Sequence, residues 1–237
     1  MKLFINKLFS NIWILRNIIE SIYVNFRCLP FKQAIHLPIL LYKPRLLALS
    51  GRIRIETKQI SFGMIQLGRN KVSFYQSTGI TIENKGLIVF KGKASICSGG
   101  CLSVNKTGAL AIGNNFTSTA ELKIACYCSI TIGENVLVGW ETKIFDTDFH
   151  RLTYLNGNNT KAYGSIVIGN NVWIANDCQI LKNTVIPDNC IIGTRSTLMT
   201  KYDVPSYSMI AGTPGKIIKT GCWLDISNMT IEYNYSY

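Results

Sequence analysis

The 237-residue sequence has few of the residues that metal sites and membrane spans require. It contains only two histidines, His36 and His150, so a catalytic zinc site with three histidine ligands is excluded. Its eight cysteines lack the paired spacing of metal-binding motifs, and we expect reduced thiols, no metal and a cytoplasmic protein. No uncharged run of about eighteen residues could span a bilayer. Charges interrupt the apolar N-terminus, so we expect no cleaved leader there.

Acidic residues are also scarce, with 13 Asp and Glu against 25 Lys and Arg and a net charge of +12. The excess is concentrated in residues 1–54, where nine basic residues face Glu20 alone. Basic charge without a recognised motif does not indicate nucleic-acid binding.

The same N-terminal region has helical periodicity. Apolar residues recur there every three or four positions, which predicts an amphipathic helix: Phe4, Leu8, Ile12, Leu15, Ile19, Ile22 and Phe26. One interpretation is that the apolar face packs as a cap on the end of the following domain. The other is peripheral contact of residues 1–26 with the inner face of the cytoplasmic membrane.

The sequence is rich in aliphatic residues with a period of six. They occupy the following positions: Ile132, Val138, Ile144, Ile168, Ile174, Ile180, Ile186, Ile192, Leu198 and Val204. Neither a helix nor an ordinary strand has this period, which is typical of a parallel β-helix whose coils of about eighteen residues stack their aliphatic side chains. Gly and Asn follow many of these positions, and both tolerate positive φ at the corners.

A weaker form of the pattern lies upstream, and it sets the expected domain boundaries. Inward pairs are predicted as follows: Ile53 and Ile55, Ile65 and Leu67, Ile80 and Ile82, Leu110 and Ile112. We therefore expect a basic N-terminal segment at 1–50, a β-helix domain at 51–221 and a C-terminal tail at 222–237.

The hexad register is interrupted once. Thirty-six residues separate Ile132 from Ile168, twice the length of one coil, so one coil's worth of chain must leave the solenoid. The predicted insertion is residues 145–165, and long loops on a rigid scaffold often carry function.

This insertion contains a histidine close to two carboxylates. Asp146 and Asp148 precede His150 by four and two residues. Histidine can gain and lose a proton near neutral pH, and a neighbouring carboxylate can orient its ring. The alternative is a solvated loop histidine without a catalytic role.

Three segments and the hexad run carry a family resemblance. The segments read Asp-Thr-Asp-Phe-His at 146–150, Ile-Gly-Asn-Asn-Val-Trp-Ile at 168–174 and Ile-Ala-Gly-Thr-Pro-Gly-Lys at 210–216. Together they resemble the hexapeptide-repeat acyltransferases, and more narrowly the bacterial sugar O-acetyltransferases of polysaccharide and capsule clusters. The resemblance implies a left-handed β-helix, usually a homotrimer, with acetyl-CoA as co-substrate and active sites between subunits.

The resemblance also implies roles for individual residues. His150 would be the general base that takes a proton from a sugar hydroxyl, and Asp148 or Asp146 would orient it. The residues expected to bind acetyl-CoA are Trp173, Gly193, Arg195, Thr200, Lys201 and Lys216. For Trp173 a covered solenoid face is an equal alternative, and for the basic residues a solvated edge.

Two substitutions depart from the family pattern. Arg195 stands where glycine is common, and Gly215 stands where alanine is usual. Two other functions stay open: N-acetylation of an amino sugar, and an idle β-helix that only binds a glycan or a protein partner.

Overall fold

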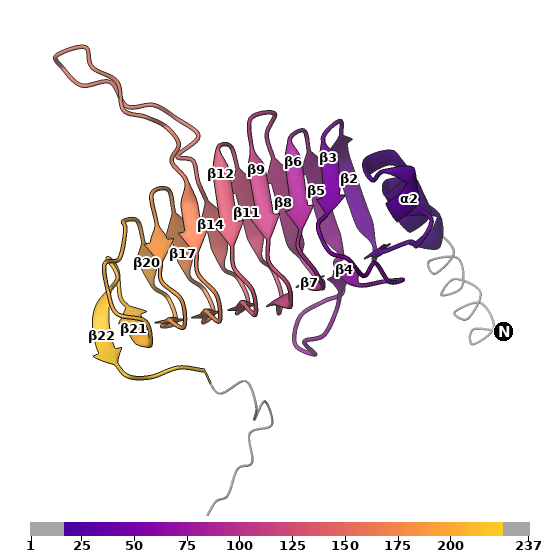
Figure 1. Ribbon diagram of the computed structural model, residues 1–237. Coiled ribbons are helices and arrows are strands. Elements are labelled where there is room, and N and C mark those ends of the chain that lie inside the picture. Colours follow the sequence, from indigo (N-terminus) through magenta and orange to yellow (C-terminus); the bar gives the residue numbers. More distant parts are fainter. Residues whose placement is uncertain (1–16, 225–237) are drawn as a thin grey trace, which may run out of the picture.

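The chain, seen in a computed structural model that describes residues 17–224, forms a triangular parallel β-helix. Three parallel sheets make the sides of the prism, and successive coils stack along one axis (Figure 1). Each complete coil gives one strand to sheet A, one to sheet B and one to sheet C, in that order along the chain.

Within each sheet the strands follow one another in spatial order along the solenoid axis. Sheet A holds β1 (Ile39–Leu41), β4 (Ile65–Arg69), β7 (Ala94–Cys97), β10 (Phe116–Ser118), β13 (Leu137–Val138), β16 (Trp173–Ile174), β19 (Ile191–Ile192), β21 (Ser208–Ala211) and the antiparallel β22 (Lys216–Thr220). Sheet B holds β2 (Pro44–Leu49), β5 (Ile80–Asn84), β8 (Gly100–Val104), β11 (Lys123–Cys126), β14 (Lys143–Phe145), β17 (Gln179–Leu181) and β20 (Thr197–Leu198). Sheet C holds β3 (Arg52–Ile55), β6 (Leu87–Phe90), β9 (Ala109–Ile112), β12 (Ser129–Ile132), β15 (Ile166–Ile168) and β18 (Val185–Ile186).

The hexad residues form the core as predicted. From Ile132 to Leu198 every predicted inward side chain is at most 1% exposed, while Val204 is only partly buried. The register pairs identical positions of successive coils, for example Ile174 with Ile192. Burying each such side chain contributes about 1.5–3 kcal/mol relative to leaving it exposed.

The solenoid begins earlier than the predicted boundary at residue 51. Its first coil contains β1 and β2, which lie before Gly51 and pair with β4 and β5 of the second coil. The hexad pattern missed them because β2 is six residues long with a register shift, so its inward residues do not recur six apart. The predicted inward pairs from Ile53 to Ile112 are all buried.

Gly and Asn serve different purposes at the corners. At Gly133 the need is space, because an added Cβ would lie 2.5 Å from the carbonyl oxygen of Gly169 on the next coil. Asn135, two residues later, takes the positive φ of 55°. Its side chain belongs to a ladder of amide hydrogen bonds, each 3.0 Å long, that joins Asn115, Asn135, Asn171 and Asn189.

A helix at residues 17–28 and the short α2 (Phe31–Ala34) cover the open end of the first coil. Three polar residues spaced four apart bond three alternate backbone positions of that coil: Asn17 to Lys43, Ser21 to Leu41 and Asn25 to Ile39. The Asn25 amide also donates to the Ile39 carbonyl at 2.7 Å. Four residues of a helix span about 6 Å and two residues of a strand span about 6.6 Å. The spacing of the three helix side chains therefore matches the spacing of their backbone partners.

The apolar positions predicted to pack on the solenoid do not do so in the described part of this helix. The predicted apolar positions Ile19, Ile22 and Phe26 are 57%, 40% and 48% exposed, whereas Ser21 and Asn25 are buried. The open end of a sheet presents unpaired backbone N–H and C=O groups, which need polar partners. The remaining apolar positions of the predicted helix lie outside the described residues: Phe4, Leu8, Ile12 and Leu15.

No helix within residues 17–224 has the length and hydropathy that a membrane span needs.

Candidate active site

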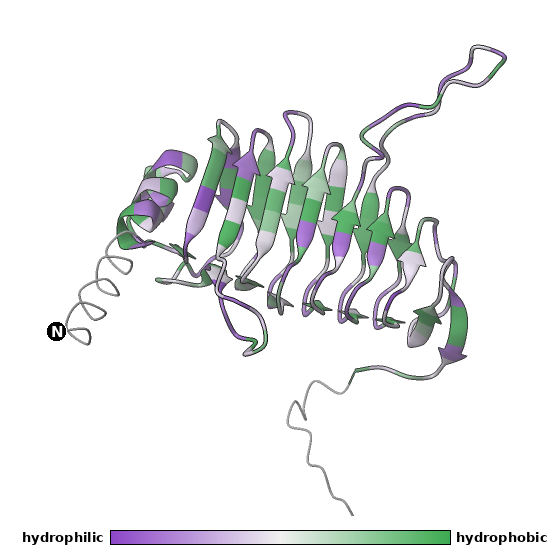
Figure 2. Cartoon of the chain, turned by 180° about the vertical axis from the view of Figure 1, so that it is seen from behind, coloured by the Kyte–Doolittle hydropathy of each residue, from purple (hydrophilic) through white to green (hydrophobic). Residues whose placement is uncertain are grey.

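The predicted insertion is a long two-stranded arm that leaves the prism between β14 and β15. It projects away from the solenoid in both views (Figures 1 and 2). Antiparallel bridges join Thr147 to Tyr163 and Thr153 to Asn159. Because β12 pairs directly with β15, the core continues past the arm without a break. The arm therefore adds chemistry without interrupting the aliphatic stack.

Asp146 fastens the base of this arm to the preceding coil. Its carboxylate is fully buried and accepts hydrogen bonds from the backbone N–H of Tyr127 at 2.6 Å and of Cys128 at 2.8 Å. Its carbonyl accepts from the Gly164 N–H at 2.9 Å, which closes the base of the arm. These contacts give Asp146 a positioning role at the root of the arm.

Asp148 is linked to the following coil instead. Its carboxylate forms an ion pair with Lys182, whose ammonium group also donates to the Lys161 carbonyl at 2.8 Å. Lys182 therefore holds both legs of the arm from the corner between β17 and β18. About half of the Asp148 side chain is exposed, so this pair is partly screened by water.

His150 follows a turn with unusual backbone geometry. Phe149 has a φ of +61°, which is uncommon for a residue other than glycine. The turn is held by a hydrogen bond of 2.9 Å from the Phe149 N–H to the Thr147 hydroxyl, and by edge contacts of the Phe149 ring with Tyr127 and Phe145. Backbone conformations of this kind cluster at functional sites.

The His150 side chain itself is exposed. Within residues 17–224 it has no hydrogen bond or ion pair to Asp146 or Asp148. The two carboxylates are instead engaged in anchoring the arm that carries it.

Of the residues predicted to bind acetyl-CoA, Thr200 and Lys201 share a prism edge with the arm. They follow β20, and Lys201 bridges to Val185 at the edge between sheets B and C. Lys182 lies on this edge one coil earlier. Thr200 and Lys201 are exposed. The arm and the two lysines, Lys182 and Lys201, therefore line one edge of the prism.

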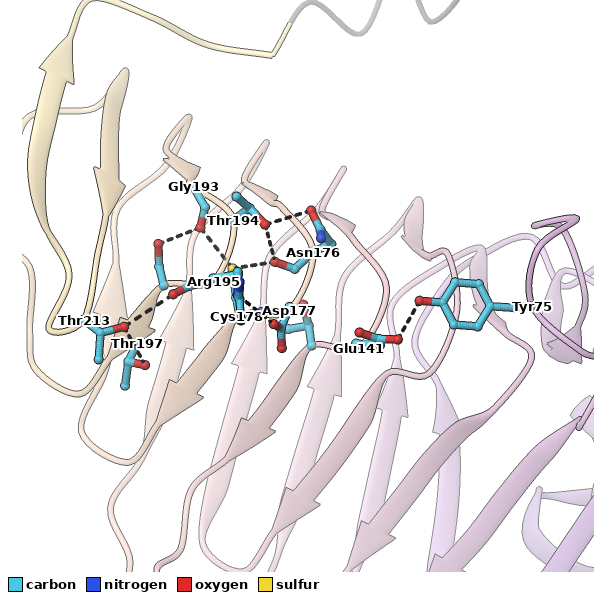
Figure 3. A network of polar contacts seen from close by, with 12 residues as sticks. Tyr75, Glu141, Asn176, Asp177, Cys178, Gly193, Thr194, Arg195, Thr197 and Thr213 are labelled. Carbon is cyan, nitrogen blue, oxygen red and sulfur yellow. Dashed lines mark hydrogen bonds and ion pairs between the residues drawn. The ribbon is translucent and has the colours of Figure 1, made fainter.

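Arg195 and Gly193 lie at the opposite border of sheet B, in the network of Figure 3. Arg195 has a φ of +57°, which explains why glycine is a natural alternative there, and its guanidinium pairs with Asp177 at 3.4 Å. The Gly193 carbonyl accepts from the Ser196 hydroxyl at 2.6 Å. A Cβ on Gly193 would lie 2.7 Å from the Ala211 Cβ, so close packing also requires this glycine.

The network of Figure 3 extends to a loop from an earlier coil. The Tyr75 hydroxyl donates a hydrogen bond of 2.7 Å to the Glu141 carboxylate. Both residues line an open hollow of about 400 Å³, together with Lys123, Lys143 and Asp177. Sequence periodicity gave no sign of this contact, because sixty-six residues separate its two partners.

Trp173 and Lys216 lie on sheet A. Trp173 is half-buried on β16, where it is paired with Leu137 and Ile191. Lys216 is exposed on β22. The residues predicted to bind acetyl-CoA are thus distributed over one face and two edges of the prism.

The second departure, Gly215, has a steric reason. An added Cβ would lie 2.9 Å from the Tyr202 hydroxyl and 3.1 Å from Leu198 Cδ1. Tyr202 occupies the space that an alanine methyl group would need.

Two buried cysteines of this region, Cys126 and Cys178, have raised pKa values. Burial, with a smaller contribution from the Asp146 charge, raises the pKa of Cys126 to about 12, and burial also raises the pKa of Cys178. A thiol with a raised pKa is a weak nucleophile at neutral pH. In the described part of the chain no cluster of three or more His, Cys, Asp and Glu side chains is arranged to hold a metal ion.

Comparison with known proteins agrees with this fold. The profile of a family described as bacterial transferase hexapeptide (six repeats) matches residues 165–199. The chain is 27% identical over 149 residues to the putative lipopolysaccharide biosynthesis O-acetyl transferase WbbJ of Escherichia coli K12, covering 58% of this chain and 74% of WbbJ. The chain is therefore similar to hexapeptide-repeat acyltransferases, and the profile match lies in the coils that follow the arm.

Two further proteins to which the chain is similar are informative. Galactoside O-acetyltransferase of Escherichia coli K12 is 36% identical over 109 residues, which cover 46% of this chain but only about half, 52%, of that enzyme. The crystal structure of the polysialic-acid-specific acetyltransferase NeuO superposes with a TM-score of 0.53 at 15% identity, covering 79% of this chain and 91% of NeuO. At that identity the likeness establishes the fold, a left-handed parallel β-helix.

The structure adds one residue at the base of the arm that sequence reasoning missed. The sequence pattern did not single out Lys182, because this lysine follows a regular hexad and looks like any solvent-exposed lysine. Only the stacking of coils shows that it lies beside the arm.

Proposed function

We propose that the protein transfers the acetyl group of acetyl-CoA to a hydroxyl group of a sugar or polysaccharide precursor, with His150 as the general base. The observation that carries the proposal is the structure of the arm. The arm presents an exposed histidine directly after a residue with positive φ, and two carboxylates hold the root of the arm to the solenoid. The names of WbbJ, galactoside O-acetyltransferase and NeuO support a saccharide acceptor.

In the proposed reaction His150 accepts the proton of the acceptor hydroxyl while the oxygen attacks the thioester carbonyl of acetyl-CoA. The tetrahedral intermediate then expels the CoA thiolate, which takes the proton from the imidazolium. General-base assistance of this kind accelerates reactions by about 100- to 10,000-fold. Transfer is direct, and the raised pKa of the buried thiol of Cys126 is consistent with a reaction that needs no acyl-cysteine.

Asp146 and Asp148 act through the arm in this mechanism. Asp146 holds the arm root to the coil before it, and the Asp148–Lys182 pair holds it to the coil after it. Holding the arm in this way restricts the position of the general base His150, which reduces the conformational entropy that must be lost when the acceptor binds.

Acetyl-CoA carries phosphates, and exposed cations suit them. Lys201 lies on the same edge as the arm, while Arg195 and Lys216 are exposed on its neighbouring edge and face. Their contact with CoA phosphates is part of the proposal.

The proposed assembly is a homotrimer. The arm exposes Phe149, Leu152, Tyr154, Leu155 and Tyr163, each by 46% or more. An apolar group of this size on a projecting segment favours a protein partner, and a neighbouring copy would complete the site. Light scattering on the purified chain tests this directly: a monomeric mass at micromolar concentration contradicts it.

Calorimetric titration with acetyl-CoA is the first test of the function. We expect binding by the full chain and by His150→Ala, and acetyl transfer to a panel of oligosaccharides by the full chain alone. His36→Ala is the matched control, because it removes the only other histidine and keeps activity. Folded protein that does not bind acetyl-CoA contradicts the proposed function.

A second pair of variants tests the cofactor edge. Lys201→Ala is expected to weaken acetyl-CoA binding. Lys91→Ala, at an exposed lysine on the edge between sheets C and A, is expected to leave the binding unchanged. Mass spectrometry of the product then separates O-acetyl from N-acetyl sugars, since hydroxylamine releases only the ester.

A further inference from the structure

The outward face of the N-terminal helix is apolar. Five of its residues are between 40% and 57% exposed: Ile18, Ile19, Ile22, Tyr23 and Phe26. At 3.6 residues per turn they occupy one arc of about 140° that contains no charged residue. Ser21 and Asn25, which bond β1, lie outside this arc. The helix therefore docks on the solenoid through Ser21 and Asn25 together with the buried Val24 and Cys28, and it leaves the apolar arc uncovered.

The apolar surface continues beyond the helix. Phe31 and Ile35 are 72% and 51% exposed, and the Phe31 ring lies 6.0 Å from that of Phe26. Phe62, 69% exposed, shares a hollow of about 290 Å³ with Ile18 and Ile22. We call these eight side chains, the five of the helix with Phe31, Ile35 and Phe62, the apolar end surface. Single exposed apolar residues are ordinary, but a contiguous group marks an interaction site.

The charges around this surface are almost all positive. Residues 17–54 contain one acidic residue, Glu20, and six basic residues, all of them exposed: Arg27, Lys32, Lys43, Arg45, Arg52 and Arg54. The sixteen residues before them add Lys2, Lys7 and Arg16 and no acidic residue. A fitting occupant is therefore apolar and anionic at once.

We propose that the apolar end surface binds an anionic lipid bilayer, with the helix at 17–28 lying in the plane of the interface. Apolar side chains would enter the headgroup region while Arg27, Lys32 and the other basic residues contact lipid phosphates. A second copy is a poorer occupant, because two surfaces of the same strong positive charge repel each other.

The orientation has a consequence for the proposed acetyl transfer, and this step alone rests on the proposed function. Between β2 and β14 sheet B contains three strands, so the arm leaves the solenoid four strand spacings, about 19 Å, from the first coil. A glycan attached to a membrane lipid would reach His150 over that distance, so the surface favours a lipid-linked acceptor.

Vesicle flotation of the full chain tests the proposal. The probes are vesicles of phosphatidylcholine alone and vesicles with about one third phosphatidylglycerol. We expect flotation with the anionic vesicles only, weakened when salt rises from about 50 mM to about 500 mM.

Two variants locate the contact. The triple variant Ile19→Ser, Ile22→Ser, Phe26→Ser is expected to lower vesicle binding about tenfold or more. The double variant Arg27→Gln, Lys32→Gln is also expected to lower it about tenfold, and it keeps the test valid if the triple variant does not fold. The matched control is Phe74→Ser, which removes an aromatic side chain that is 70% exposed on another loop and is expected to bind vesicles normally.

Three results would overturn the proposal: no flotation with anionic vesicles, equal flotation of the wild-type chain and both variants, or a change of mass of the triple variant in light scattering without vesicles. The last result would assign the surface to a second copy. Acetyl-CoA calorimetry on the same samples separates this proposal from the enzymatic one, because vesicle-binding variants should keep the affinity of the wild-type chain.

Discussion

The solenoid and the arm differ in how much of their chain is buried and paired. In the solenoid, Ile174 is buried between Val138 and Ile192 of the neighbouring coils, and its strand is paired on both sides. In the arm, residues 148–159 are all exposed, and the two legs are joined to each other by isolated bridges and to the solenoid only near their base. The buried contacts are concentrated in the first region and the proposed chemistry in the second, so we expect a substitution to affect one and spare the other.

Replacing the proposed base should produce the largest effect. We expect His150→Ala to lower kcat by about 100- to 10,000-fold, because the acceptor hydroxyl loses its proton acceptor. The midpoint of urea unfolding should not move, since the side chain is exposed. A variant with normal turnover would remove His150 from the chemistry.

The core should show the reverse pattern. Ile174→Ala removes a side chain that is 0% exposed and leaves a cavity between two coils, which should cost about 2–5 kcal/mol of unfolding free energy. Below the unfolding transition its kcat should stay near the wild-type value. Urea denaturation with parallel assays measures both, and a large loss of kcat in the folded variant would argue against separate regions.

Asp146 connects the arm to the solenoid, so its replacement should affect both stability and activity. In Asp146→Asn the amide NH₂ would face one of the two backbone N–H donors, so we expect a loss of about 1–3 kcal/mol in stability. Because the arm root loosens, kcat should fall as well. Hydrogen exchange at Tyr127 and Cys128 would report the loss, and unchanged exchange there would contradict the role assigned to the carboxylate.

The smallest effect is expected at Lys182. Lys182→Met removes a partly exposed ion pair with Asp148 and should change stability by about 0–1 kcal/mol. Displacement of the arm should still lower kcat/KM about three- to tenfold. Lys182→Arg, which keeps the charge, is the control and should recover most of the activity. Equal activity of the Met and Arg variants would show that the arm positions His150 without this contact.

Several features of the site were open to prediction from the residues in order. The doubled spacing from Ile132 to Ile168 located the insertion, and the structure has it leave after β14 and return at β15. The contacts of Asp146 and Asp148 could not be predicted, because their partners lie on coils before and after the arm. The sequence left open which carboxylate serves His150, and the structure shows both engaged in holding the arm.

The N-terminal helix is a further case of this limit. Its periodicity identified an apolar face and a polar face, as Ile22 and Ser21 illustrate. Which face would meet the solenoid depended on the backbone groups exposed at β1, and these favour Ser21 and Asn25. The pattern alone suggested the wrong face.

By itself the sequence determined the coil, its core and the place of the arm, because a side chain that points inward every six residues is a local property of the chain and repeats. Only the tertiary structure decided how the arm is held, which helix face docks and why Gly215 replaces alanine. Those outcomes depend on hydrogen bonds and close contacts between residues of different coils, and no local pattern encodes them.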